Sequence, residues 1–153
     1  MEIDYTVAPS TRQGKGLFAK QRVKRGERIW RCDDQSTKTH DRQSLTDKLQ
    51  TLSTQDKTRL LEHLYTWDGK VVEILDDAKL WNHSRKHQNT GNHPDGDGDG
   101  LGDGVSSYAL RDIEAGEELL DDYSSYARLE WFESLCVAHG ARSCVAVGDS
   151  IAD

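Results

Sequence analysis

Acidic side chains in the second half of the chain suggest a first kind of chemistry, the binding of a divalent cation. Asp95, Asp97, Asp99 and Gly100 match positions one, three, five and six of a calcium-binding loop. Position twelve would then be Ser106, where such a loop needs a bidentate Glu, and no flanking helices are predicted. The pattern therefore favours an acidic Asp/Gly loop over a calcium site, and leaves weak Ca²⁺ binding open.

Three histidines offer a second possible metal site. His83 and His87 have the spacing of two ligands on a helix, and His93 follows a few residues later. Pro94 and the neighbouring glycines make this segment loop-like, so the histidines would not be held in a fixed arrangement. We therefore predict no metal ligands here.

A Gly-Lys-Gly stretch at Gly14, Lys15 and Gly16 allows the backbone to approach a ligand closely. It lacks the third glycine and the helix of a dinucleotide-binding fingerprint, and no phosphate-binding lysine motif follows it. Its meaning therefore depends on the other motifs with which it is combined.

Composition narrows the class of protein. The 153 residues suit one domain with one core. The net charge of −7 and the lack of a basic stripe argue against direct binding of nucleic acid, and make a basic peptide the more natural partner. No apolar run approaches the ~20 residues that span a bilayer, and the first residues do not form a signal peptide.

The three cysteines, Cys32, Cys136 and Cys144, are odd in number and widely spaced. This usage fits a reduced, intracellular protein, cytoplasmic or nuclear, better than a disulfide framework. Cys136 and Cys144 have neither of the short spacings typical of a closed zinc site.

Hydrophobic periodicity predicts strand-rich halves around a helical insert at 36–66. Ser44 begins a capping-box variant and is predicted to start the first helix of the insert, while Ser53 or Thr54 is predicted to cap the second. Asp68-Gly69 then predicts a two-residue hairpin turn between two short strands.

An internal echo links the two strand-rich halves. Residues 19–29 and 109–119 share the pattern Ala-x3-(Val/Ile)-x2-Gly-Glu-x-(Ile/Leu). The repeat predicts two similar units, each made of a strand, a tight turn at Gly and a second strand.

The C-terminal half contains a predicted flexible Asp/Gly loop at 85–104 and a helix that we place within 127–140. Gly140 has the position of a helix C′ residue. We expect the domain to end near 140 and the small, mixed residues of 141–153 to form a frayed tail.

Taken together and in order, three blocks resemble the SET-domain protein-lysine methyltransferases. The blocks are Gly14-Lys15-Gly16-Leu17-Phe18-Ala19, Asn82-His83-Ser84, and Gly116-Glu117-Glu118-Leu119 followed two residues later by Asp122-Tyr123. The likeness runs from about residue 8 to residue 135. Glu130-Trp131-Phe132 is also similar to members in which a C-terminal helix, rather than a cysteine-zinc module, closes the active site.

The resemblance implies a mainly β fold with a small helical insert and a C-terminal helix. In this SET fold, several small twisted sheets surround a C-terminal segment that threads under a preceding loop. It also implies S-adenosylmethionine on one face, a lysine peptide on the other and a narrow channel between them. The negative net charge would suit a basic protein tail such as a histone's, with Asp33-Asp34 and Asp76-Asp77 contributing to an acidic surface.

The resemblance assigns roles residue by residue. It implies that Tyr123 is catalytic and aligns the amine with the methyl group. The implied cofactor-binding residues are Gly14, Lys15, Gly16, Asn82, His83 and Trp131, and the implied substrate-channel residues are Trp81, Asp121 and Phe132.

The chain departs from the family pattern at three places. Lys79-Leu80-Trp81 replaces the usual Arg-aromatic-aliphatic, and the usual Pro-Asn is missing, with Asn89 as its possible substitute. Asp121 stands where many members have a Tyr that narrows the channel. The number of methyl groups added is therefore left open.

Two alternatives follow from these departures and from the Asp/Gly loop. One is a SET-like module that binds peptides or a partner without catalysis, and the other is a calcium-responsive interaction domain. A homodimer that completes the substrate groove is possible for a small stand-alone member of this kind.

Overall fold

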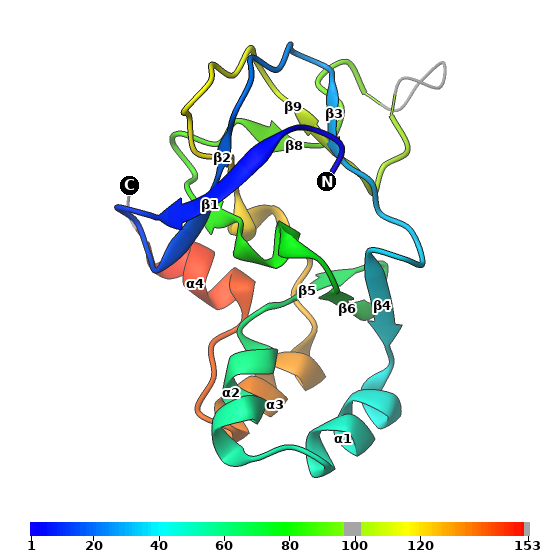
Figure 1. Cartoon of the computed structure of the whole chain (residues 1–153). Coiled ribbons are helices and arrows are strands. Elements are labelled where there is room, and N and C mark those ends of the chain that lie inside the picture. Colours follow the sequence, from blue (N-terminus) through cyan, green and yellow to red (C-terminus); the bar gives the residue numbers. More distant parts are fainter. Residues whose placement is uncertain (97–101, 152–153) are drawn as a thin grey trace.

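A computed structural model describes residues 1–96 and 102–151 (Figure 1). The elements, with η for a 3-10 helix, are β1 (Tyr5–Pro9), β2 (Lys15–Ala19), β3 (Arg28–Trp30), β4 (Thr37–His40), α1 (Arg42–Gln50), α2 (Thr54–Leu61), β5 (Leu64–Trp67), β6 (Lys70–Ile74), η1 (Asp77–Leu80), β7 (Asn82–His83), β8 (Thr90–Gly91), β9 (Ser107–Ala109), β10 (Leu120–Asp121), η3 (Tyr123–Ser125), α3 (Glu130–Ala138) and α4 (Cys144–Ser150).

The strands form four small sheets. β1 pairs with β2, β9 lies between β3 and β8, and β6 lies between β4 and β5, all in antiparallel order, whereas β7 and β10 pair in parallel. Figure 1 shows β1, β2, β3, β8 and β9 in one half of the molecule and α1, α2 and α3 in the other. The predicted fold class of several small sheets with a helical insert and a C-terminal helix is confirmed, while threading of the C-terminal segment stays a prediction.

The two echo segments, 19–29 and 109–119, pair with each other through reciprocal backbone hydrogen bonds. Ala19 N donates to Glu117 O (2.9 Å) and Gly116 N to Ala19 O (2.7 Å), and likewise Ala109 N donates to Glu27 O (2.9 Å) and Gly26 N to Ala109 O (2.8 Å). Both glycines have positive φ, +82° and +90°, which explains why each turn needs Gly. The repeat is therefore a paired structural unit. Its second copy leads directly into β10 and η3.

Two hydrophobic cores correspond to the two halves. The first is built around Leu17, Ile29, Ile113 and Leu119, and the second packs α1, α2 and α3 over the β5–β6 hairpin. The predicted Asp68-Gly69 turn is confirmed, with φ of +47° and +72° at its two residues.

One predicted helix start is confirmed and one is wrong. Ser53 caps α2, as expected, and its side chain accepts a hydrogen bond from Asp56 N. In α1 the cap is Asp41, not Ser44: the Asp41 carboxylate accepts the Ser44 N–H at 2.8 Å. Ser44 therefore lies inside the first turn of α1. Its free backbone N–H is satisfied by the side chain of Asp41, three residues earlier.

The expectation of a frayed tail at 141–153 is wrong for the described part of that segment. Residues 144–150 form α4, capped by Ser143, with Cys144, Val145 and Gly148 buried. α4 packs directly on η3, because Gly148 has no side chain: a Cβ there would lie 2.6 Å from Ser124 N. An ion pair between Arg128 and Asp149 (2.5 Å) further ties the helix down.

The predicted loop at 85–104 is only partly a loop. Thr90–Gly91 form strand β8, and Asp95 pairs with Arg25 through two hydrogen bonds of 2.6 and 2.9 Å. Asp97, Asp99 and Gly100, which carry the expectation of flexibility and of calcium binding, lie outside the described residues.

Within 1–96 and 102–151, no helix has the length and apolar character needed to cross a membrane. The helices of this part of the chain have at most nine residues.

Asn89 holds β10 in place with both ends of its side-chain amide. Its Nδ2 donates to Glu118 O (2.8 Å), and its Oδ1 accepts from Leu120 N (2.8 Å). Its own backbone N donates to Leu120 O at 3.0 Å, and the side chain is buried. The residue proposed as a substitute for the missing Pro-Asn therefore fixes the strand that precedes Tyr123.

We predict that Asn89→Ala lowers the free energy of unfolding by about 2–6 kcal/mol, because it leaves Glu118 O and Leu120 N unpaired at about 1–3 kcal/mol each. Urea denaturation measures this. Asn92→Ala, at an exposed position close by, is the control and should change stability by no more than about 0.5 kcal/mol. Equal losses of stability in the two variants would show that the Asn89 side chain does not hold β10 in place.

Candidate functional site

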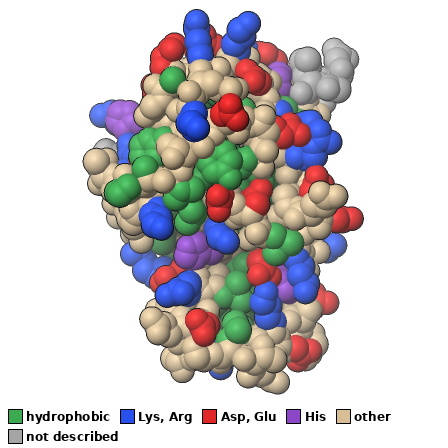
Figure 2. All heavy atoms as spheres, in the orientation of Figure 1, with side chains coloured by type: hydrophobic (Ala, Val, Ile, Leu, Met, Phe, Trp, Pro, Cys, Tyr) green, Lys and Arg blue, Asp and Glu red, His purple; other side chains and the backbone are tan. Residues whose placement is uncertain are grey.

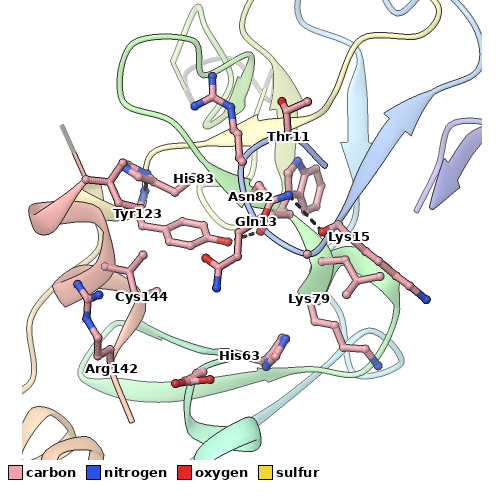
Figure 3. Close-up of a pocket in the computed structure, with 17 residues that line it drawn as sticks. Thr11, Gln13, Lys15, His63, Lys79, Asn82, His83, Tyr123, Arg142 and Cys144 are labelled. Carbon is pink, nitrogen blue, oxygen red and sulfur yellow. Dashed lines mark hydrogen bonds between the residues drawn. The ribbon is translucent and has the colours of Figure 1, made fainter. Parts of the chain in front are cut away.

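Two cavities and a narrow passage lie along β7, β10 and η3. The first cavity, about 670 Å³, is lined by the Gly14-Lys15 turn, η1, β7, Tyr123 and α4 (Figure 3). The second, about 380 Å³, is lined from β5, the β8 region and the segment 104–107. A space of about 50 Å³ shares lining residues with both. Trp81 lines all three, so the two cavities and the small space between them adjoin one another around this residue.

Asn82 and the glycine turn form one wall of the first cavity. Asn82 Nδ2 donates to Lys15 O (3.1 Å) and to Glu118 Oε1 (2.7 Å). Gly16 lies directly behind this contact, where a Cβ would come within 2.1 Å of Glu118 Oε1 and 2.9 Å of Asn82 Nδ2. The short glycine turn thus lets three chain segments meet, as close backbone approach requires.

His83 is buried beside Tyr123, with their ring centroids 5.3 Å apart. Its Nδ1 lies 3.1 Å from Tyr123 N, a donor, and 3.3 Å from Asp121 O, an acceptor. In the shorter contact Nδ1 accepts the Tyr123 N–H, and the ring proton is then on Nε2. Nε2 is buried and has no hydrogen-bond partner among the described residues. A buried donor of this kind is free to bind a ligand atom in the cavity that His83 lines.

Phenol rings line the passage. Tyr123 lines the first cavity and the passage, and its hydroxyl donates a hydrogen bond to Trp81 O. The ring of Tyr126 lies 5.2 Å from that of Tyr65 and 6.4 Å from that of Tyr123, measured between centroids. Burial raises the pKa of all three tyrosines, so each is a neutral phenol at physiological pH.

Asp121 is the acidic group of this aromatic wall. It lines the passage and the second cavity. Its Oδ2 accepts the Tyr126 hydroxyl hydrogen, and its Oδ1 accepts the Asp122 N–H at 2.8 Å. Removal from solvent raises the pKa of the Asp121 carboxyl, and the hydrogen bond from Tyr126 opposes that shift.

Basic side chains surround the mouth of the first cavity. Figure 3 shows Lys15 and Lys79 across the cavity from Arg142 and Cys144. Such an arrangement suits a ligand that carries a carboxylate, because each cation can donate a charge-assisted hydrogen bond.

Most of the residues assigned from sequence come together here. Gly14, Lys15, Asn82, His83 and Tyr123 line the first cavity. Trp81 and Asp121 line the passage, and Gly16 lies behind the cavity wall.

Two assigned residues lie elsewhere. Phe132 is fully buried in the second core, and Trp131 packs beside it at a centroid distance of 6.0 Å. Neither lines the cavities or the passage found among the described residues. The reason is that α3 directs this face at α1 and α2, so the proposed channel role of Phe132 and stacking role of Trp131 find no support in the structure.

The helix that covers the first cavity is α4, not the helix within 127–140. Cys144 and Val147 of α4 line it, together with Arg142 and Ile151 at the two ends of this helix. Sequence reasoning missed these residues, and also Tyr65 and Tyr126 of the passage. Ser143 followed by small residues was the available signal for a closely packed helix, but it does not specify what the helix covers.

No group of three or more His, Cys, Asp or Glu side chains lies close enough to hold a metal ion in the part of the chain that the structure describes. His83 uses its Nδ1 on Tyr123 N, which is incompatible with metal ligation through that atom.

We predict that Gly148→Ala loosens α4 from η3. The added Cβ would lie 2.6 Å from Ser124 N and 3.0 Å from the Tyr123 backbone, and backbone atoms cannot move aside cheaply. Hydrogen exchange of residues 144–150 should become about 5- to 150-fold faster, since overpacking costs about 1–3 kcal/mol. Ser134→Ala, at an exposed position of α3, is the control. Unchanged exchange in Gly148→Ala would contradict the close packing.

Comparison with known proteins gives a family and two similar structures. Residues 14–124 match the SET domain family. A solved structure of a candidate histone methyltransferase from Plasmodium falciparum has a TM-score of 0.51 at 19% identity, covering 86% of this chain and 99% of that one. A structure of ctPRC2 in complex with H3K27me3 and H3K27M has a TM-score of 0.54 at 17% identity, covering 86% of this chain and 16% of that one. Among curated proteins, no match was found.

Proposed function

Because this chain belongs to the SET domain family, we propose that it is an S-adenosylmethionine-dependent protein-lysine N-methyltransferase. The observation that carries the proposal is a pair of cavities with a small, partly aromatic space between them, bordered by Trp81, Tyr123 and Asp121. A methyl donor in one cavity and a lysine entering from the other would meet in that passage.

The first cavity fits the cofactor. The buried Nε2 of His83 has no hydrogen-bond partner within 1–96 and 102–151, and the Gly14-Lys15 turn brings backbone to the cavity wall. We assign Asn82, His83 and the Gly14–Gly16 turn to cofactor binding, with the basic side chains at the mouth available to its carboxylate. When bound, the cofactor supplies a methyl group on a cationic sulfur.

The passage acts on the lysine. Nucleophilic attack needs a neutral amine, and at a pKa of about 10.4 deprotonation at pH 7 costs about 4.6 kcal/mol, at about 1.36 kcal/mol per unit. A passage lined by neutral phenols and Trp81 excludes water and lowers the pKa of the amine. Tyr123, with its hydroxyl hydrogen committed to Trp81 O, keeps oxygen lone pairs to accept an amine N–H and orient the nitrogen.

The second cavity is assigned to the substrate peptide. One of the two similar structures is of a candidate histone methyltransferase and the other is of a complex with H3K27me3 and H3K27M, and a basic histone-like tail is our proposed substrate class here. The net charge of −7 favours such a partner. A homodimer that completes the groove remains part of this proposal.

Local charge, however, differs from the expected acidic surface. Asp76 is used inside the fold, where it accepts from Trp30 Nε1 (3.0 Å) and pairs with the N-terminal amine (3.3 Å), and Asp77 accepts from the Tyr5 hydroxyl. Figure 2 shows basic and acidic side chains interspersed over the face seen in Figure 1. The attraction of a basic partner by the net charge is therefore not confined to one patch of this face. Asp121 is a carboxyl group that lines both the passage and the second cavity.

We predict that Tyr123→Phe reduces methyl transfer to mixed core histones at least about 10²-fold while S-adenosylmethionine binding changes less than about threefold, because positioning contributes to transfer and not to cofactor binding. Transfer of labelled methyl groups measures the rate, and calorimetry measures binding.

Tyr5→Phe is the matched control, since it removes a phenol hydroxyl bonded to Asp77 outside both cavities. Cofactor binding without label transfer by the unaltered protein would favour the non-catalytic peptide-binding module. Absence of both would refute the methyltransferase proposal.

A further inference from the structure

The passage contains a carboxyl group with unused hydrogen-bonding capacity. An ionised carboxylate accepts about four hydrogen bonds. The structure shows two on Asp121, one from Tyr126 Oη and one from Asp122 N, so each oxygen retains a lone pair. Because Asp121 lines both the passage and the second cavity, these lone pairs can face a group that enters from that cavity.

Other side chains of the passage are poorly suited to accept a proton. Tyr65, Tyr123 and Tyr126 are neutral phenols, because burial raises the pKa of each. The Cys144 thiol is also neutral, because burial raises its pKa to about 12. Glu62 and His63 line the passage as well, but both are exposed near the end of α2. Asp121 is the carboxyl group that is shared between the passage and the peptide cavity.

Building on the proposed methyl transfer, we propose that Asp121 accepts the proton of the substrate lysine before the methyl group is transferred, with Tyr126 holding the carboxylate in position. An N–H bond of the ammonium breaks and an O–H bond forms on Asp121. The freed nitrogen lone pair then bonds to the methyl carbon, and the C–S bond breaks with its electrons left on sulfur. The proton on Asp121 passes to water through the second cavity before the next turnover.

The surroundings of Asp121 determine the pH at which it works. Burial and the charge of Asp122 raise its pKa, while the Tyr126 hydrogen bond and His83 lower it. The titratable groups around it are Tyr65 of β5, His83 of β7, Asp122, Tyr123, Tyr126 and Cys144 of α4. Since Asp121 must be ionised to accept a proton, the rate falls as the pH drops through this raised pKa.

The activity test compares pH profiles of methyl transfer to mixed core histones. At pH 7, Asp121→Asn should be slower by about 10²-fold, the usual contribution of a general base. Its rate should recover as the pH rises toward about 10, because the lysine then loses its proton unaided. Tyr126→Phe should keep most of the activity but move the acid limb to higher pH, since the carboxylate loses a stabilising hydrogen bond.

Asp122→Asn is the matched control. It makes the same chemical change one residue away, at a side chain that caps η3 through Ser124 N (3.0 Å) and can still do so as an amide. It should show no alkaline recovery. S-adenosylmethionine binding and melting temperature, measured for each variant, confirm that the site is folded. A folded Asp121→Asn protein with the rate and pH profile of the unaltered protein would overturn the role of Asp121 while leaving the methyltransferase proposal intact.

A second arm does not depend on turnover. The side-chain ¹³C resonance of Asp121, assigned by its loss in Asp121→Asn, is titrated with n-butylamine as a lysine side-chain probe in the presence of S-adenosylmethionine. We expect the Asp121 resonance to titrate above the normal carboxyl range and to shift with n-butylamine, while Asp122 does not respond to the amine. No response of Asp121 to the amine would overturn the inference, whether or not the protein methylates histones.

Discussion

The site depends on a parallel pairing of only two residues from β7 with two from β10. A contact this short is not stable alone, because few backbone bonds offset the entropy of ordering both segments. Hydrogen bonds from side chains supply the additional stabilisation that this short pairing needs. Asn89 bonds on both sides of Leu119, and Thr90 Oγ1 donates to Leu120 O at 2.9 Å. The strand that leads to Tyr123 is therefore held by polar groups in a buried setting, where each lost hydrogen bond is costly.

This pairing also links the two proposed ligand sites. β7 contributes Asn82 and His83 to the first cavity, whereas β10 contributes Asp121 to the passage and the second cavity. The Tyr123 N–H bonded to His83 Nδ1 connects the end of β10 back to β7. A change in register of one residue would therefore exchange the side chains that face the cofactor and the lysine.

Local sequence signals predicted the parts of the fold that local chemistry controls. The Asp68-Gly69 turn, the Ser53 cap and Gly140, with φ of +66° after α3, each follow from one or two residues. The 19–29 and 109–119 echo predicted two similar units, but not that they bond to each other, because pairing of distant segments leaves no local signature. Likewise, the ordered motifs pointed to Asn82, His83 and Tyr123, whereas Tyr65 and Tyr126 join the passage only through tertiary packing.

The C-terminal segment shows why composition misled the prediction of a frayed tail. Small residues bury little apolar area and were taken as a sign of disorder. In the structure their smallness is what allows α4 to approach η3, since Gly148 lies against the backbone of Tyr123 and Ser124. Trp131 and Phe132 have a different explanation: they were assigned to the site because Glu130-Trp131-Phe132 resembles a family motif, but in this fold both pack into the second core.

The two departures that flank the motifs have different consequences. Trp81 contributes its backbone carbonyl to the Tyr123 hydroxyl, and any residue type can supply that acceptor. Its ring packs edge-on against Trp30 at a centroid distance of 6.3 Å, which makes it a part of the first core as well. Asp121, by contrast, presents its side chain to the passage. In our proposal a carboxylate at this position supplies a proton acceptor in place of an aromatic ring, so residue 121, more than residue 81, is where this chain would differ in chemistry from the family pattern.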